Sequence, residues 1–555
     1  MWSELLDALD LSQLSKQAVE LDYVAAHTRE WPLELCVLGT EHVPWPFVEP
    51  PPLWPLARVV SVKDRRLKLP ELAAFLASEH LDGIEGLDLS YNKLGVDGVE
   101  VLIESGRLNQ LTWLDLSCCQ IGDSGAQALA GALGTSPISS LSLRNNKIKS
   151  KGAVGFYRSP NLGSLVHLDF ARNSFGAAGG KAIAANPAAG SLRSLDLHSA
   201  SVGDGGFRAL CGSRVLRMLE RLDVSACRLA DKSGEFLRKA LFAPAIRALD
   251  LSDNSEALVF DALAEGSFPK LEELHLTSIP YASPQLAALG AAPWAPALRV
   301  LTIGAPRQAG IARIAVAHNF TGLASLRLHG GVLTVDQCRR LLDSRGLRRL
   351  RDLRVMSITL GDLSEPGLAS LRGLHRMSKL SPAFSDEGNP EDFKQDLATA
   401  DLSGVTQFEF PRFAADYAAE GLAANPTAGD LQRLVMHGYT DGTDAALVAI
   451  ASSPHLRSLR AIEFNGSGLT DDGVEALAGS ENLSGVRRLF LTGELLGAAA
   501  AESVAASPHL KSIERLGLAG AAVHHASWDR LAAGTPATWR AFLMNQTVRG
   551  STGDV

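Results

Sequence analysis

The feature that most constrains this chain is a repeat with a period of about 27 residues. Its clearest copy runs from Leu111 to Leu129 and reads LTWLDLSCCQIGDSGAQAL. Leu114 and Leu116 alternate with polar residues, which predicts a short strand with one face in a core. The following GDSGAQAL predicts a helix that Asp123 or Ser124 can cap. One strand and one helix of this size cannot bury a core alone, so each unit must stack on its neighbours.

The repeat runs through most of the chain. We count 18 units with spacings of 25 to 28 residues, and therefore expect one array over 57–525. It should be irregular near 377–411, where Pro382 falls in a strand position. Residues 1–56 are predicted to form an N-terminal helical and Pro/Trp-rich capping segment, and 526–555 a C-terminal cap and tail. The units begin near Ala57, Ile84, Leu111, Ile138, Leu165, Leu192, Leu219, Ile246, Leu271, Leu298, Leu323, Leu350, Met377, Val405, Leu431, Leu459, Val486 and Ile513.

Two segments outside the regular pattern each allow two interpretations. WPFVEPPPLWP, at 45–55, is either a polyproline-type ligand or part of a cap whose tryptophans shield the first repeat, and we favour the cap. The acidic segment 384–402 is either a protruding loop that contacts a partner or a decayed unit with a solvated helix. For this segment we favour the decayed unit.

Composition narrows the class of protein. The chain has 555 residues, 46% apolar and 21% charged, which is typical of a folded protein, and its net charge of −8 argues against a general nucleic-acid binder. No apolar run approaches the roughly 20 residues of a membrane span. The N-terminal MWSELLDALDLSQ is unlike a signal peptide, so a cytoplasmic location is expected. The six cysteines show no metal-binding or disulfide spacing, and no cofactor is predicted.

The units resemble leucine-rich repeats of the ribonuclease-inhibitor-like class. The matching pattern is LxxLxLxxNxL followed by a G-D-x-G-x-x-x-L-A helix, as in IEGLDLSYNKL, ISSLSLRNNKI, IGDSGAQALA and LTDDGVEALA. Long Ala-rich arrays of this kind occur in bacterial proteins. The resemblance implies an α/β solenoid, a curved horseshoe with parallel strands on the concave face and helices on the convex face. Strands stack about 4.8 Å apart and helices about 8–10 Å apart, which also bends the stack.

The ninth place of the unit is asparagine in several units and cysteine in two. The resemblance implies that this side chain satisfies backbone groups where the strand turns away. Cysteine at this place is then a buried thiol; the alternative is a catalytic or metal-binding pair at Cys118 and Cys119. The residues at this place include Asn92, Cys119, Asn146, Asn173, Cys227 and Asn254.

Residues between the strand leucines should face the concave surface, because a strand alternates its faces. The fifth place is acidic in six of seven successive units, which predicts either an acidic stripe for a basic partner or the family consensus LDLS. The sequence is consistent with both interpretations, a binding stripe and a family consensus. The acidic residues are Asp88, Asp115, Asp169, Asp196, Asp223 and Asp250, with Ser142 between them. The other predicted partner-binding residues are Tyr91, Trp113, Arg144, His167, His198, Arg221, His275, Arg327 and Arg354.

Two histidine–carboxylate pairs could belong to a catalytic triad. His167 with Asp169 and His198 with Asp196 share strand faces, and Ser194 or Ser225 could complete a triad. Nothing in the sequence supplies a strained nucleophile turn or an oxyanion hole. We therefore predict a non-enzymatic protein-interaction scaffold or inhibitor-like module that binds a protein partner and neither nucleic acid nor membrane. The alternative is an enzyme or enzyme activator, such as a regulator of a GTPase or hydrolase, acting through the concave face or 384–402.

Overall fold

The computed structural model describes residues 36–38, 43, 47, 54 and 57–519, except 231, 255–257, 279–282, 305–318, 361–376, 378, 385–388, 412, 437–439, 494 and 514. The chain divides into two compact units. Unit 1 comprises 1–281 with 291–297, and unit 2 comprises 282–290 with 298–555. The predicted caps at 1–56 and 526–555 lie almost wholly outside the described residues and stay predictions.

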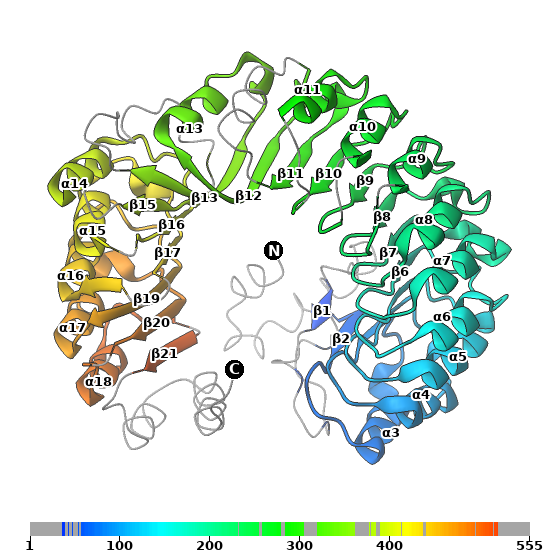
Figure 1. Ribbon diagram of the computed structural model, residues 1–555. Coiled ribbons are helices and arrows are strands. Elements are labelled where there is room, and N and C mark those ends of the chain that lie inside the picture. Colours follow the sequence, from blue (N-terminus) through cyan, green and yellow to red (C-terminus); the bar gives the residue numbers. More distant parts are fainter. Residues whose placement is uncertain are drawn as a thin grey trace. The chain divides into compact units, whose positions relative to one another are not determined.

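In unit 1, every strand pairs in parallel with the next one along the chain, and the helices lie on the other side of the sheet (Figure 1). The strands are β1 (Val37–Leu38), β2 (Val59–Ser61), β3 (Gly86–Asp88), β4 (Trp113–Asp115), β5 (Ser140–Ser142), β6 (His167–Asp169), β7 (Ser194–Asp196), β8 (Arg221–Asp223), β9 (Ala248–Asp250) and β10 (Glu273–Leu276). The helices are α3 (Leu69–Ala77), α4 (Gly95–Glu104), α5 (Gly122–Ala132), α6 (Ser150–Tyr157), α7 (Gly176–Ala185), α8 (Gly203–Cys211), α9 (Ser233–Arg238) and α10 (Leu258–Glu265).

Unit 2 repeats the pattern with longer strands. Its strands are β11 (Val300–Gly304), β12 (Ser325–Thr334), β13 (Asp352–Leu360), β14 (Lys379–Leu380), β15 (Pro382–Phe384), β16 (Gln407–Glu409), β17 (Arg433–Val435), β18 (Thr440–Thr443), β19 (Ala461–Gly468), β20 (Arg488–Thr492) and β21 (Arg515–Ala519). Its helices are α11 (Ser283–Ala291), α13 (Val335–Leu342), α14 (Pro390–Thr399), α15 (Ala415–Ala424), α16 (Asp444–Ser452), α17 (Asp471–Ala478) and α18 (Ala498–Ala506).

The predicted periodicity is confirmed. A strand begins two residues after each of the 18 predicted unit starts. Leu111, Leu114 and Leu116 are fully buried, as the alternation around β4 predicts. These parallel strands and their helices form the predicted α/β repeat solenoid.

The irregular unit at Met377 divides its strand between two neighbours. β14 pairs forward with β16, whereas β15 pairs back with β13. Pro382 begins β15, and a proline has no N–H to donate to a sheet. In the segment 384–402, residues 390–399 form α14, which buries Phe393 and Leu397; residues 385–388 lie outside the described part.

Buried asparagines close several repeats of unit 1, as the family resemblance implies. The Asn173 amide oxygen accepts from the N–H groups of Asn146 (3.0 Å) and Ile148 (3.1 Å). Its nitrogen donates to the carbonyl oxygens of Leu143 (2.9 Å) and Phe170 (3.1 Å). The prediction for this ladder is confirmed. Asn92, Asn146 and Asn254 bond in the same way.

In the eight units that begin at Ile84 to Leu271, the residue before the ladder position adopts a left-handed backbone. The φ angles lie between 51° and 60° although none of the residues is glycine. Side chains of very different chemistry occupy this place, so the strain belongs to the turn and not to one residue. The residues are Tyr91, Cys118, Asn145, Arg172, Ser199, Ala226, Asp253 and Ser278.

An aromatic cluster fills the core of unit 1 between α6 and β6. The ring centroid of Tyr157 lies 4.8 Å from that of Phe170 and 5.8 Å from that of Phe175. The Tyr157 hydroxyl is buried and has no hydrogen-bond partner among the described residues. Burial also raises the pKa of this hydroxyl well above its usual value.

Replacing Tyr157 by phenylalanine should leave the protein as stable as wild type or more stable by about 1 kcal/mol. The variant removes an unsatisfied buried hydroxyl and keeps the ring contacts. Chemical denaturation followed by circular dichroism measures the change. A loss above about 1 kcal/mol would mean that the hydroxyl has a partner after all.

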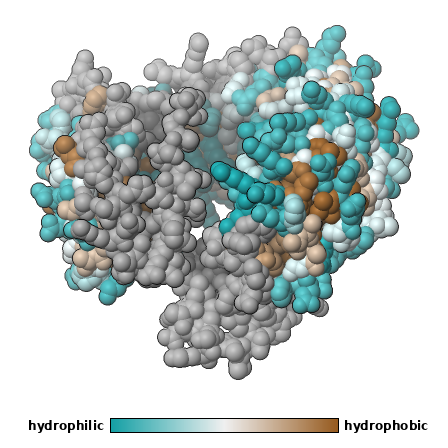
Figure 2. All heavy atoms as spheres, turned by 90° about the horizontal axis from the view of Figure 1, so that it is seen from below, coloured by the Kyte–Doolittle hydropathy of each residue, from teal (hydrophilic) through white to brown (hydrophobic). Residues whose placement is uncertain are grey.

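The described surface is mainly hydrophilic. Figure 2 shows hydrophilic side chains over most of the described part of one face, with apolar side chains in smaller areas. The most exposed large apolar residues are Leu495 (61%), Met218 (53%) and Tyr91 (51%). Within the described ranges, no helix has the length and apolar character needed to cross a bilayer.

Candidate functional site

The six aspartates of the fifth place lie in register on the strand face of unit 1. Asp88 pairs with Asp115, and Asp169, Asp196, Asp223 and Asp250 follow in register on β6 to β9. Ser142 holds the same place on β5, between the two groups. Strands in a sheet lie about 4.8 Å apart, which brings these carboxylates close together. We call Asp88, Asp115, Asp169, Asp196, Asp223 and Asp250 the acidic row.

Each carboxylate of the acidic row also closes its own turn. One oxygen of Asp196 accepts from the His198 N–H at 2.8 Å, two residues further on. The other five aspartates accept from the equivalent N–H at 2.7 to 2.9 Å. The LDLS consensus therefore has a structural role, and the second oxygen of each carboxylate remains for other contacts.

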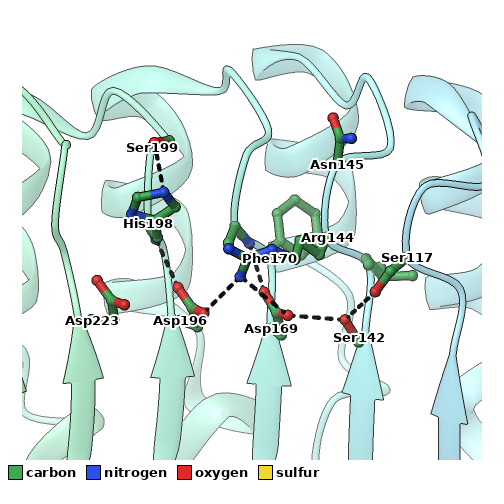
Figure 3. Close-up of polar contacts among 12 residues, drawn as sticks. Ser117, Ser142, Arg144, Asn145, Asp169, Phe170, Asp196, His198, Ser199 and Asp223 are labelled. Carbon is green, nitrogen blue, oxygen red and sulfur yellow. Dashed lines mark hydrogen bonds and ion pairs between the residues drawn. The ribbon is translucent and has the colours of Figure 1, made fainter. Parts of the chain in front are cut away.

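Arg144 joins two members of the acidic row. Its guanidinium lies 3.2 Å from Asp196 and 3.7 Å from Asp169, and points along the row in Figure 3. The Ser142 hydroxyl donates to Asp169 at 3.0 Å and lies 2.8 Å from the Ser117 hydroxyl. Within the described ranges, no other arginine or lysine forms an ion pair with the row.

Burial and the negative charges of neighbouring aspartates raise the pKa of three carboxyl groups. Burial is the largest cause for Asp196, followed by the charges of Asp169 and Asp223, and its pKa rises to about 7. Burial and the same kind of repulsion raise the pKa of Asp115 and Asp250. The row is therefore short of positive charge near neutral pH.

Replacing Asp196 by asparagine should stabilise the protein at pH 8 by about 1–3 kcal/mol and have little effect near pH 4. An ordinary aspartate in the unfolded chain loses its proton near pH 4, but Asp196 in the folded protein does so only near pH 7. The folded state thus holds more protons in this window, and wild-type stability falls as pH rises. Asparagine cannot titrate, yet it can still accept from the His198 N–H.

Urea denaturation of both proteins at several values between pH 4 and pH 8 measures this difference. Asp97→Asn, at an exposed helix position, is the control. A constant difference between wild type and Asp196→Asn across the range would contradict the prediction.

The histidines do not form the triads considered from the sequence. His198 Nδ1 lies 2.7 Å from the Ser225 hydroxyl, which in turn donates to Asp223 at 2.5 Å. In a triad the imidazole lies between the hydroxyl and the carboxylate, but here Ser225 holds that position. No hydrogen bond between described side chains joins His167 to Asp169 or His198 to Ser194.

The remaining predicted residues of unit 1 surround the acidic row. Tyr91 is exposed and carries the Lys63 ammonium 4.8 Å from its ring centroid. Trp113 is half-buried, with its ring against the backbone of Gly86. Arg221 pairs with Glu273 at 3.1 Å. His275 pairs in register with Asp250.

Two predicted residues belong to unit 2. Arg327 on β12 and Arg354 on β13 lie in register with each other. Arg354 pairs with Asp352 at 3.0 Å. The Nε of Arg327 is buried without a hydrogen-bond partner among the described residues. These two arginines belong to unit 2, whereas the acidic row belongs to unit 1.

Our sequence reasoning missed Ser117 as a link along the acidic row, and it considered Ser225 only as a possible triad member. Ser117 and Ser225 stand two residues after Asp115 and Asp223, and both bond to side chains on the neighbouring strand. The Asp-x-Ser pattern was the available signal, since aspartate commonly bonds to the backbone two residues on.

The cysteines are structural. The Cys119 thiol is buried, donates to the Leu89 carbonyl at 3.2 Å, and has its pKa raised to about 12 by burial. Cys227 bonds in the same way, with its pKa raised to about 11. No cluster of histidine, cysteine and carboxylate suited to a metal occurs among the described residues.

Comparisons with known proteins agree with the repeat geometry. The leucine-rich repeat family profile matches residues 84–102, 109–130, 164–184 and 455–478. No curated protein sequence matches the chain.

Several solved structures show a weak similarity. An internalin from Listeria monocytogenes is 15% identical over 64% of this chain and 87% of that one, with a TM-score of 0.33. A leucine-rich repeat protein from Leptospira interrogans is 14% identical over 86% and 94%, with a TM-score of 0.31. The yeast Rad7–Elc1 complex is 12% identical over 95% and 94%, with a TM-score of 0.33. Scores this low carry no argument about function or partners.

The strand, the closing turn and the helix recur in order within each unit, and buried asparagines close the turns of unit 1. Four segments match the family profile. The chain is therefore a leucine-rich repeat protein.

Proposed function

We propose that this protein is a non-enzymatic scaffold of the ribonuclease-inhibitor-like class that binds a partner protein through the strand face of unit 1. The observation that carries the proposal is the acidic row, with six carboxylates in register and Arg144 as the one arginine or lysine paired with it among the described residues. Leucine-rich repeat arrays generally present such extended surfaces to proteins.

The negative charge of the row goes beyond what the repeat needs. Each turn requires an acceptor, which a neutral asparagine could supply as well as an aspartate. Ser142 shows that a neutral residue fits the same place on β5. Burial, and after it repulsion from charged neighbours, raises the pKa of Asp115, Asp196 and Asp250, which disfavours their ionised form.

A partner with lysine or arginine side chains would relieve this repulsion. Its cations would meet partly desolvated carboxylates that the sheet already holds in place, so little ordering free energy is lost on binding. We place this binding in the cytoplasm, whose reducing conditions suit the six free thiols. No metal or cofactor takes part in it.

The experiment is a pull-down from native lysate at low and moderate salt, followed by mass spectrometry. The test variant is Asp115→Asn/Asp196→Asn/Asp223→Asn, which keeps an acceptor in each turn and removes three charges. The control is Asp97→Asn/Asp343→Asn/Asp472→Asn, which removes three exposed charges elsewhere.

A partner captured by wild type and by the control, but lost by the test variant, supports the proposal. A partner that all three proteins capture equally refutes binding by the acidic row. Turnover of a substrate that disappears with His198→Ala would instead favour the enzyme alternative.

A further inference from the structure

A run of arginines follows helix α13 in unit 2. Residues 345–354 read RGLRRLRDLR, and the leucines in this run are buried to 1% exposure or less. Arg345, Arg348, Arg349 and Arg351 are exposed. We call these four residues the arginine edge. The segment thus has one face in the core and a strongly basic face toward solvent.

The repeat does not require arginine at these places. Leu353 pairs in register with Leu326, so the preceding unit supplies a residue-by-residue comparison. It carries Thr321, Gly322 and Ala324 where this unit has Arg348, Arg349 and Arg351. Both turns make the same backbone bond, from Leu323 N–H to Phe320 at 3.0 Å and from Leu350 N–H to Leu347 at 3.0 Å. Small neutral residues therefore build the same turn.

The arginine edge is not neutralised within the described residues. Neighbouring arginines have carboxylate partners: Arg340 pairs with Asp336 at 2.8 Å, and Arg354 with Asp352 at 3.0 Å. No ion pair or side-chain hydrogen bond of the arginine edge occurs within the described ranges. Like charges at about 4–8 Å repel by about 0.5–1 kcal/mol per pair in water, so the cluster opposes folding slightly.

Further arginines extend this positive surface. In the backbone ladder, Ala324 N–H bonds to the Arg299 carbonyl at 2.8 Å, and Arg351 N–H bonds to the Ala324 carbonyl at 2.8 Å. Arg299 and Arg351 therefore lie two strands apart, at about 10 Å. From Arg351 the chain continues into β13, where Arg354 lies in register with Arg327.

We propose that the arginine edge, together with Arg299, docks an acidic segment of a partner protein. Guanidinium groups bind carboxylates through two parallel hydrogen bonds, and several at this spacing can engage successive acidic side chains of one segment. This surface is separate from the acidic row and prefers a ligand of the opposite charge.

Two observations favour a protein segment over nucleic acid. No exposed phenylalanine, tyrosine or tryptophan that could stack on a base occurs in the described part of 298–360. Asp336, Asp343 and Asp352 are interleaved with the arginines and would repel a continuous phosphate backbone. A protein segment can place its own basic or neutral residues opposite these carboxylates.

Fluorescence anisotropy with the full-length chain tests the proposal. The probes are a fluorescein-labelled glutamate-rich 12-residue peptide, its glutamine counterpart, and a single-stranded oligonucleotide of equal charge. The test variant is Arg348→Glu/Arg349→Glu/Arg351→Glu. The control is Arg214→Glu/Arg217→Glu/Lys239→Glu, which reverses three exposed cations of unit 1. The milder Arg348→Ala/Arg349→Ala/Arg351→Ala serves if the charge reversal disturbs folding.

The proposal expects wild type and the control to bind the glutamate peptide alike, and the test variant to bind it about tenfold more weakly or worse. Equal binding by all three proteins, or no binding by wild type, overturns it. Tighter edge-dependent binding of the oligonucleotide than of the peptide overturns the choice of a protein segment.

Discussion

Replacing Asn173 by alanine is expected to lower the free energy of unfolding by about 3 kcal/mol or more. The side chain is fully buried, and its amide satisfies the N–H groups of Asn146 and Ile148 and the carbonyl of Leu143. Alanine leaves these backbone groups in the core without partners. Each unsatisfied buried group costs about 1–3 kcal/mol, partly reduced if water enters the site.

Asn109→Ala is the control for this prediction. Asn109 is exposed and accepts one hydrogen bond from the Thr135 hydroxyl at 3.0 Å, so its loss should change stability by about 0.5 kcal/mol or less. Urea denaturation midpoints for wild type and both variants measure the difference. Similar small effects for the two variants would show that the ladder asparagine is dispensable.

Replacing Gly152 by alanine is expected to destabilise the protein by about 2–3 kcal/mol, whereas the same change at Gly131 should stabilise it. Gly152 lies in the first turn of α6, and an added Cβ would meet the Asp123 Cα at 2.5 Å. Backbone cannot move aside as a flexible side chain can, so the helix itself must shift. That shift would also disturb the 2.7 Å bond from the Lys149 N–H to Asp123.

Gly131 is the matched control, since it lies in the neighbouring helix α5. A Cβ added there meets nothing within 4 Å. Alanine should then add about 0.5–1 kcal/mol through its better helix propensity. Thermal denaturation of the two single variants gives the comparison. Destabilisation of both to the same degree would argue against close helix packing as the cause.

The strands could be predicted because their signal is local and repeated. The leucines of each unit fall at positions that only a short strand and turn can bury together, so each unit start located its strand to the residue. The family resemblance implied the asparagine ladder and the buried thiols of Cys119 and Cys227, because these residues occupy one fixed place in the unit.

The contacts of the candidate site were harder to predict. Arg144 reaches Asp196 across two repeats, and side-chain reach of this kind is not encoded in the spacing of the leucines. The sequence placed His198 beside Asp196 with Ser194 or Ser225, whereas the observed order His198–Ser225–Asp223 depends on rotamers that the repeat spacing does not give. In the unit at Met377, β14 pairs with β16 and β15 pairs with β13. Pro382 indicated an irregular strand, but it did not indicate which neighbour each half would pair with.

The residues that precede the ladder positions and adopt a left-handed backbone have a consequence for engineering and for evolution. Tyr91, Cys118, Asn145 and Arg172 adopt the same backbone conformation, although they share neither size nor charge. Side chains of different size and charge therefore fit this turn, although the eight residues include no β-branched residue and no proline. A library randomised at these turns would diversify one continuous line on the surface while every core residue stays unchanged. Natural drift has the same freedom, so new specificities can arise along this line without passing through unfolded intermediates.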